Sequence, residues 1–392
     1  MTGWGPARAG FTLAELVVAT AITLLLAGAL LSMLGPGSMA FRTQPALVEM
    51  QQRLRFAADV LSSRAMTAGS APGGGLSGDP LGLLTACLLP YRIGHRRPDP
   101  PGSWAASTLT LVSGKAGGAV AFLRDRLPAG VLTAQIDASR CPPALPGCGL
   151  AVGTNLLLLP GGGQADLYRV GAVAGSTLTL LGASGTAPRS YPAGTPLAAV
   201  EIDVFYLRQG AGEDGWQLMR YDGWESDLPL LDHVVRFEVT CFGEARPPRF
   251  HEGAAAGESG STYGPPPPPA GVDVPEDSWG AGENCVFARD GGSVVSRLTA
   301  LGDNQLALVA LDRSVLTDGP WCPDALAAGR FDADLFRVRR IRLALSVEAA
   351  SSGSRGRDTA VFARPGHAAS PHALAPDRHL TFDIVPRSLG GW

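Results

Sequence analysis

Hydrophobic residues are unevenly distributed along the chain, and the longest apolar run lies near the N-terminus. Residues 11–34 read FTLAELVVATAITLLLAGALLSML, a run of 24 residues with a single charged side chain, Glu15. As an α-helix this run would extend about 36 Å, which exceeds the roughly 30 Å hydrocarbon core of a bilayer. The pattern therefore predicts a membrane-spanning helix over residues 11–34.

A second helical pattern follows the Gly-Pro-Gly sequence at 35–37. Proline lacks an amide donor and clashes with the preceding turn, so this sequence is predicted to end or kink the first helix. Beyond it, apolar residues recur at steps of three and four, and this spacing predicts an amphipathic helix over 35–66 packed on a β-sheet. The apolar stripe consists of Leu47, Met50, Leu54, Ala57 or Ala58, and Leu61.

The pattern changes to short strands from about residue 105. Segments 154–159, 165–170 and 176–181 are apolar and evenly spaced, as in an antiparallel meander. Gly (51) and Pro (32) together make about a fifth of the chain, against a usual share of about 12%. This composition favours a loop-rich β body over a bundle of helices.

Apolar and polar residues alternate in 201–206, 235–241 and 341–347, and 380–385 forms a last predicted strand. Alternation indicates one buried and one solvent-facing side, and Asp203 falls on the solvent-facing side. We therefore expect an α+β fold, in which a long N-terminal hydrophobic stem helix packs on an antiparallel β-sheet head with large loop insertions.

The charges argue against a broad nucleic-acid surface. The chain has 32 Lys and Arg against 35 Asp and Glu, a net charge of -3, and its basic residues are scattered. Phosphate binding over a large area needs a concentrated positive field. DNA is thus a possible partner that the sequence does not indicate.

The six cysteines include no CxxC pair, so a zinc or thioredoxin-type motif is unsupported, and disulfides outside the cytoplasm are the better interpretation. Cys141 and Cys148 bracket the tight segment PPALPG, and we expect them to pair. The remaining cysteines allow three pairings among which the sequence does not choose. These are Cys87, Cys241, Cys285 and Cys322.

The first ten residues contain Arg8 and no acid, so the positive-inside tendency places them in the cytoplasm and the rest of the chain outside. An ordinary secretory signal has a shorter, uninterrupted apolar stretch. Here Glu15 lies close to the start of the run, and a carboxylate in the membrane costs a few kcal/mol on insertion scales. Glu15 therefore needs a partner or a function.

The residues at 10–16, GFTLAEL, resemble the prepilin cleavage and methylation motif of type IV pilins and type II secretion pseudopilins. The resemblance implies that a prepilin peptidase cuts between Gly10 and Phe11 and methylates the new amino group of Phe11. It also implies that Glu15 pairs with the Phe11 amine of a neighbouring subunit. An ammonium and a carboxylate buried together neutralise each other, whereas either alone is strongly destabilising. The alternative is a plain signal anchor with a chance glutamate.

The order of elements in the body is similar to that of PilW-like minor pilins and, more weakly, of GspJ-like pseudopilins. This similarity covers about 150–245 and 335–390. It rests on the segment 191–197, which leads into a strand that ends at 206–207, and on the segments 218–220, 230–242 and 338–347 that follow.

The predicted segments are a prepilin leader (1–10), a transmembrane stem (11–34), a lower stem (35–66), a loop-rich variable region (67–150), a β head (151–242), a Pro/Gly-rich insertion (243–284) and a C-terminal β part of the pilin-like head (285–392).

No catalytic motif is present: the chain has no GxSxG elbow, phosphate-binding loop, HExxH or dinucleotide-binding glycine pattern, so we expect a non-enzymatic protein without a cofactor or metal. The run of five prolines at 265–269 predicts an extended, exposed loop. Two groups of polar residues could bind a metal or calcium but are more often solvated or capping side chains. They are His367, His372 and His379, and Asp303, Asn304, Asp332 and Asp334.

Three functions are consistent with these features. The first is a minor pilin of a type IV pilus that acts in pilus assembly and initiation or in a tip function such as adhesion, motility or DNA uptake. The second is a type II secretion pseudopilin, and the third is a membrane-anchored or secreted binding protein or exoenzyme. The first implies a prepilin peptidase, other pilins, the inner-membrane assembly platform and membrane lipid as partners. It also implies a single-pass protein of the bacterial inner membrane, with the head outside the cytoplasm, that moves to the pilus at the cell surface.

Overall fold

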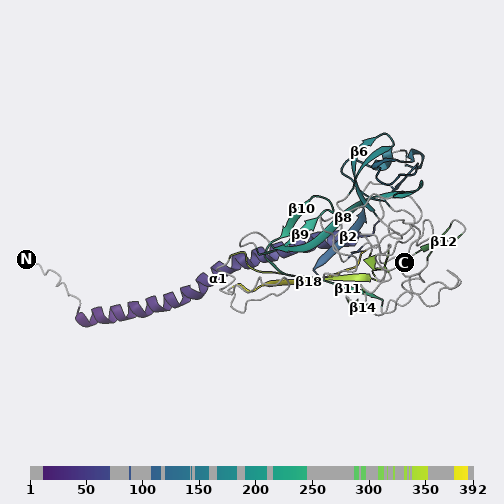
Figure 1. Cartoon of the computed structure of the whole chain (residues 1–392). Helices are drawn as coiled ribbons and strands as arrows, with labels where there is room; N and C mark the ends of the chain where they lie inside the picture. Colours follow the sequence, from purple (N-terminus) through teal and green to yellow (C-terminus); the bar gives the residue numbers. More distant parts are fainter. Residues whose placement is uncertain are drawn as a thin grey trace, which may run out of the picture.

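In the computed structural model of the chain, one long helix leads into an antiparallel β head, which confirms the expected α+β class (Figure 1). For residues 33–43 only the helical backbone is described. The structure describes residues 12–70, 88–89, 107–115, 120–141, 143, 146–158, 166–182, 190–209, 215–244, 287–290, 293–296, 308–312, 316, 321–322, 331–332, 335, 338–351 and 375–386. The proline run at 265–269 lies outside them.

Helix α1 runs from Leu13 to Thr67, 55 residues, and is therefore about 80 Å long. Residues 35–37 were expected to end or kink the helix, and they do not end it: the helix continues through this sequence and curves on its way to the head (Figure 1). A proline removes one backbone hydrogen bond, while the turns on either side keep theirs. Packing of the second half of α1 on the head then stabilises the turns that follow.

A sheet of four antiparallel strands forms one side of the head. Its order is β14 (Leu308–Leu311), β11 (Val234–Glu244), β17 (Val338–Val347) and β18 (Arg378–Ile384). Val239 lies opposite Leu343 in the register, and both side chains are buried. The predicted alternation in β11 and β17 is confirmed. The segment 230–242 contains the end of β10 (Asp227–Leu231) and most of β11, which are separated at His233, where φ is 55°.

The longest strand, β8 (Pro196–Gln209), is the axis of a second, ten-stranded sheet. Along one edge it pairs with β2 (Thr108–Gly114) and then β3 (Val120–Phe122). Along the other edge it pairs with β9 (Trp216–Tyr221) and then β5 (Asn155–Leu158). The two halves of β8 therefore have different neighbours, and each half belongs to a different part of the head.

The N-terminal half of β8 belongs to a small closed barrel. From β8 the pairing continues through β5, β6 (Asp166–Ala174) and β7 (Thr177–Gly182) to β4 (Thr133–Gln135). A bridge between Leu123 and Ile136 then joins β4 back to β3. Closure leaves the six strands without a free edge between β3 and β4. Figure 1 shows this barrel, marked by β6, projecting on the side away from the start of α1.

Two hydrophobic cores result from this arrangement. The barrel interior is one core, and the second half of α1 with the four-stranded sheet and the C-terminal half of β8 forms the other. Alternate residues of β8 divide between them: Leu197 and Ala199 face the barrel core, whereas Ala198 and Val200 face the core around α1. The predicted helical stripe is confirmed from Met50 to Leu61. Its buried members are Met50, Leu54, Ala57, Leu61 and Ala65.

The remaining elements are short. β1 (Leu88–Leu89) pairs with β2, and two separate hairpins are formed by short strands near the C-terminal part. These are β12 (Phe287–Asp290) with β13 (Ser293–Ser296), and β15 (Trp321–Cys322) with β16 (Phe331–Asp332). Two 3-10 helices, η1 (Ala138–Arg140) and η2 (Pro146–Gly149), lie between β4 and β5. The region predicted as loop-rich, 67–150, thus contributes β1 to β4 to the head.

Candidate assembly site at the start of the stem helix

Glu15 lies in the first turn of α1, where it forms a capping box with Thr12. The Thr12 backbone amide donates to Glu15 Oε2 at 2.9 Å, and the Thr12 hydroxyl donates to the same oxygen at 3.0 Å. The Glu15 amide donates back to Thr12 Oγ1 at 3.3 Å. These bonds satisfy amides at the helix start that have no partner within the helix. Gly10 and Phe11 lie outside the described residues.

Thr12, a residue of the motif to which the resemblance assigns no role, is the capping partner of Glu15. The spacing Thr12-x-x-Glu15 before an apolar run is itself a readable capping signal. Among the described residues, both donors to the Glu15 side chain belong to Thr12 and both reach Oε2. The carboxylate therefore has acceptor capacity on Oε1 for a further donor.

The helix beyond Glu15 presents a continuous apolar surface to its surroundings. Residues Leu13–Ser32 are long enough and apolar enough to cross a membrane, and none of that span is buried against the described head. Such a surface in water would be strongly unfavourable, so it requires lipid or other apolar helices around it. Its large exposed side chains are Leu13, Leu16, Val17, Val18, Ile22, Leu24, Leu25, Leu26, Leu30 and Leu31.

The other end of the stem is fixed to the head by a cluster of charges. Arg64 Nη1 lies 2.5 Å from Glu201, and Arg64 Nε lies 3.5 Å from Asp203. Arg220 on β9 donates to Asp203 at 2.6 Å. The prediction that Asp203 faces solvent is wrong, since the residue is only 3% exposed. Two guanidinium groups compensate its burial, and the cluster sets how α1 meets β8.

A second arginine of α1 contacts backbone at the far side of the stem. Arg53 donates to the carbonyl oxygens of Asp232 and Glu348 at 3.5 and 3.4 Å. Glu49, one turn earlier, lies 3.6 Å from the same guanidinium. Arg53 thereby joins the helix to the turn before β11 and to the residue after β17. The stem and the head are thus connected at two separated points.

The expected disulfide between Cys141 and Cys148 is present, with a Cα–Cα distance of 4.7 Å. Cys241 is a buried free thiol, so the expectation that it pairs with another cysteine is wrong. Burial raises the pKa of this thiol to about 12. Cys87 and Cys285 lie outside the described residues, and the side chain of Cys322 is not described.

Among the described residues, no group of three or more His, Cys, Asp or Glu side chains could hold a metal ion. His379 Nδ1 instead lies 2.7 Å from the Ser346 hydroxyl on the neighbouring strand β17. The other histidines and acids considered as metal ligands fall on undescribed residues or on a side chain that is not described. They are His367, His372, Asp303, Asn304, Asp332 and Asp334.

Comparison with known proteins identifies the N-terminal segment. Residues 6–31 match the family model of the prokaryotic N-terminal methylation motif. No curated protein sequence matches the chain. The matched residues contain Gly10, Phe11 and Glu15 and extend over most of the exposed apolar span. The motif and the apolar helix together support a processed type IV pilin-like or pseudopilin protein with a membrane anchor.

Proposed function

We propose that the protein is a PilW-like minor pilin, a non-enzymatic subunit that acts in the assembly or initiation of a type IV pilus or at its tip. The observation that carries this proposal is the methylation motif over 6–31, which continues into an exposed apolar helix with one carboxylate near its start. A head with two cores at the other end of the stem provides the surface for its specific contacts.

Processing prepares the end of the helix for assembly. A prepilin peptidase removes residues 1–10 on the cytoplasmic side and methylates the new amino group of Phe11. In the apolar interior of a filament this ammonium needs a counter-charge, because an unpaired buried charge is strongly destabilising. Glu15 of a neighbouring subunit supplies it. The capping contact with Thr12 stabilises the same carboxylate before that partner arrives.

The location follows from the same chemistry. The newly made protein is anchored in the inner membrane by α1, with the head outside the cytoplasm. Membrane lipid covers the apolar face of α1 until the assembly platform transfers the subunit into the filament, where other pilins cover it. The motif also supports a type II secretion pseudopilin, whose stem would be processed in the same way.

The proposal is tested by mass analysis and by deletion in the native host. Intact-mass and N-terminal peptide analysis of membrane protein should find a chain that starts at methylated Phe11 when the prepilin peptidase is present and at Met1 when it is absent. Deletion of the gene should then reduce surface pili and leave type II secretion unchanged. Loss of secretion with normal pili would instead assign the pseudopilin role. A Met1 start in peptidase-positive cells would overturn both.

A further inference from the structure

The barrel and the stem core share the strands β5, β6 and β8, whose alternate residues face one core or the other. Within the barrel, the inward residues of β5, β6 and β7 contact one another and the N-terminal half of β8. The stem core is built from α1, β11, β17 and one face of β8, and it also includes Leu157 of β5 and Leu167 of β6. The C-terminal half of β8 is held on both edges by β2 and β9. Loss of the barrel would therefore leave those pairings of β8 in place.

The weakest part of the barrel is its seam between β3 and β4, strands of three residues each. The bridge between Leu123 and Ile136 consists of two backbone hydrogen bonds: Arg124 N donates to Gln135 O and Asp137 N donates to Phe122 O, both at 2.8 Å. Short pairings of this kind open more readily than long ladders. The seam is thus where the barrel would separate first.

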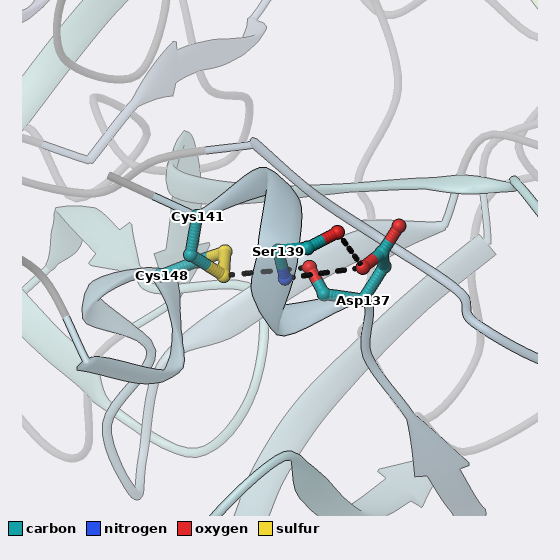
Figure 2. Close-up of a disulfide and its surroundings, with 4 residues drawn as sticks. All are labelled: Asp137, Ser139, Cys141 and Cys148. Atoms are coloured by element: carbon teal, nitrogen blue, oxygen red, sulfur yellow. Dashed lines mark hydrogen bonds between the residues drawn. A yellow bond between two sulfur atoms is a disulfide. The ribbon is translucent and has the colours of Figure 1, made fainter. Parts of the chain in front are cut away.

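The disulfide lies next to this seam, in the segment that follows β4. Asp137, whose amide closes the seam, also caps η1 by accepting from the Ser139 amide at 3.1 Å and hydroxyl at 2.6 Å (Figure 2). At the end of η1, Cys141 is bonded to Cys148, which has no exposed surface and lies in the barrel core. Arg140, the residue before Cys141, places its guanidinium 3.4 Å from the centroid of the Phe122 ring on β3.

The stem core contains a cysteine that, unlike Cys141 and Cys148, is not in a disulfide. Cys241 on β11 is free and buried, and burial raises the pKa of its thiol to about 12. Since only a thiolate attacks a disulfide, this cysteine exchanges slowly with the Cys141–Cys148 bond. Its reactivity toward alkylating reagents therefore reports whether the stem core has opened.

We propose that the Cys141–Cys148 disulfide is a redox lock on the barrel alone: its reduction lets the barrel open while the stem core stays folded. In the reduction, an external dithiol gives two electrons and two protons. The S–S bond breaks, two cysteine thiols form, and the dithiol becomes a cyclic disulfide. The lock is independent of the proposed pilus function, because it follows from the seam and the two cores.

The size of the effect follows from the loop that the bond closes. The cysteines are 7 positions apart, and removing a crosslink over so short a loop increases the entropy of the opened state. On the chain-entropy relation, the population of opened barrel should rise roughly 50- to 100-fold. Amide hydrogen exchange in the barrel core should accelerate by the same factor, because exchange there follows opening.

The test uses the full chain in detergent micelles, with and without dithiothreitol, by hydrogen exchange and mass spectrometry. Peptides from β6 and β7 should exchange roughly 50- to 100-fold faster after reduction, whereas peptides from β11 and β17 should change less than about twofold. Peptide-resolved alkylation should modify Cys141 and Cys148 and leave Cys241 protected.

The double variant Cys141→Ser with Cys148→Ser lacks the disulfide, so its barrel peptides should exchange faster without a reductant. This variant tests the proposal even when dithiothreitol does not reduce the wild-type bond. Cys241→Ala is the matched control, and its barrel peptides should exchange as in the wild type. Equal acceleration of barrel and stem-core peptides would overturn the proposal, because the head would then be one cooperative unit. So would unchanged barrel exchange in a chain shown by mass to lack the disulfide.

Discussion

Arg64, in the last turn of the stem helix, lies 3.5 Å from Asp203, a carboxylate that is almost completely buried on the central strand of the head. Arg220, from the adjacent strand β9, reaches the other oxygen of Asp203 at 2.6 Å. The carboxylate therefore contacts two guanidinium groups that come from different elements, and Glu201 is a second partner of Arg64. A buried carboxylate of β8 thus joins the last turn of the stem helix to the head.

Replacing this carboxylate should be costly. Asp203→Asn keeps the shape and removes the carboxylate that pairs with Arg220, while Arg64 keeps Glu201 as a partner. We expect a loss of about 2 kcal/mol in the free energy of unfolding, the usual contribution of a hydrogen bond to a charged group. Chemical denaturation of the full chain in detergent measures the loss. Arg236→Ala is the control, because its partner Glu238 is solvent-accessible and such pairs contribute less than about 1 kcal/mol. Equal losses in the two variants would contradict the role of Asp203.

The buried stripe of the stem makes a second prediction. Leu61 has no exposed surface, so Leu61→Ala should create a cavity between α1 and the sheet and cost about 2–5 kcal/mol. Phe56, on the same helix, is 59% exposed, and Phe56→Ala should cost well under about 1 kcal/mol in the isolated subunit. Denaturation midpoints of the two variants provide the comparison. A larger loss for Phe56→Ala would mean that the opposite face of the helix is packed.

An ion pair on the outer face of the four-stranded sheet should make the free energy of unfolding depend on pH in the acidic range. Arg342 donates to both oxygens of Asp383, at 2.7 and 3.0 Å, and this hydrogen bonding lowers the pKa of the Asp383 carboxyl. A carboxyl with a lowered folded-state pKa contributes stability above its unfolded pKa of about 3.9 and loses it as the pH falls through the folded value.

Asp383→Asn should therefore denature slightly earlier than the wild type at pH 7, and the gap should close as the pH falls below the unfolded pKa of about 3.9 and through the lower folded value. Urea midpoints at several pH values measure it. Asp125→Asn serves as a comparison, because Asp125 pairs with its sequence neighbour Arg124 rather than across strands. A gap for Asp383→Asn that widened in acid would show that the carboxyl destabilises the folded state.

Local patterns predicted several features correctly. The helical stripe from Met50 to Leu61 and the alternation in β11 depend on periodicity, and the packing follows it. Cys141 and Cys148 paired as expected because a short segment holds them together. Alternation also placed Cys241 on a buried face. The even number of cysteines suggested that Cys241 forms a disulfide, but its thiol is free and buried in the core.

Features that depend on distant pairing were not predictable in this way. β3 and β4 have three residues each, too few for a periodic signal, and they exist because β8 and β7 offer partners far along the chain. Asp203 fitted a solvent-facing position by alternation, and only the approach of Arg64 from the helix explains its burial. Pro36 predicted a helix end or a kink by its chemistry, and the helix continues past it because its second half packs on the head.

The residue before the cleavage point should control processing. Gly10→Ala adds a methyl group where the prepilin peptidase would cut, so a larger fraction of the protein should keep residues 1–10. Intact-mass analysis of membrane protein measures the fraction of precursor. Gly3→Ala, the same change seven positions earlier in the leader, should leave processing at the wild-type level. Equal processing of Gly10→Ala and wild type would remove the argument for a cut at this position.

The charge of Glu15, rather than its capping bond, should decide assembly. Glu15→Gln keeps a side-chain oxygen that accepts from Thr12 and removes the charge, whereas Glu15→Val removes both. If the carboxylate neutralises the Phe11 amine of a neighbour, both variants should be cleaved normally and enter filaments at least about tenfold less than wild type, because an unpaired buried ammonium costs several kcal/mol.

Thr20→Val is the matched control for a lost polar group, because the Thr20 hydroxyl bonds only the Val17 carbonyl of its own helix among the described residues. It should assemble as the wild type does, and immunoblots of sheared filaments against total membrane protein give all the ratios. Normal incorporation of Glu15→Gln with poor incorporation of Glu15→Val would assign the role to the capping bond. Normal incorporation of both would refute pairing through Glu15.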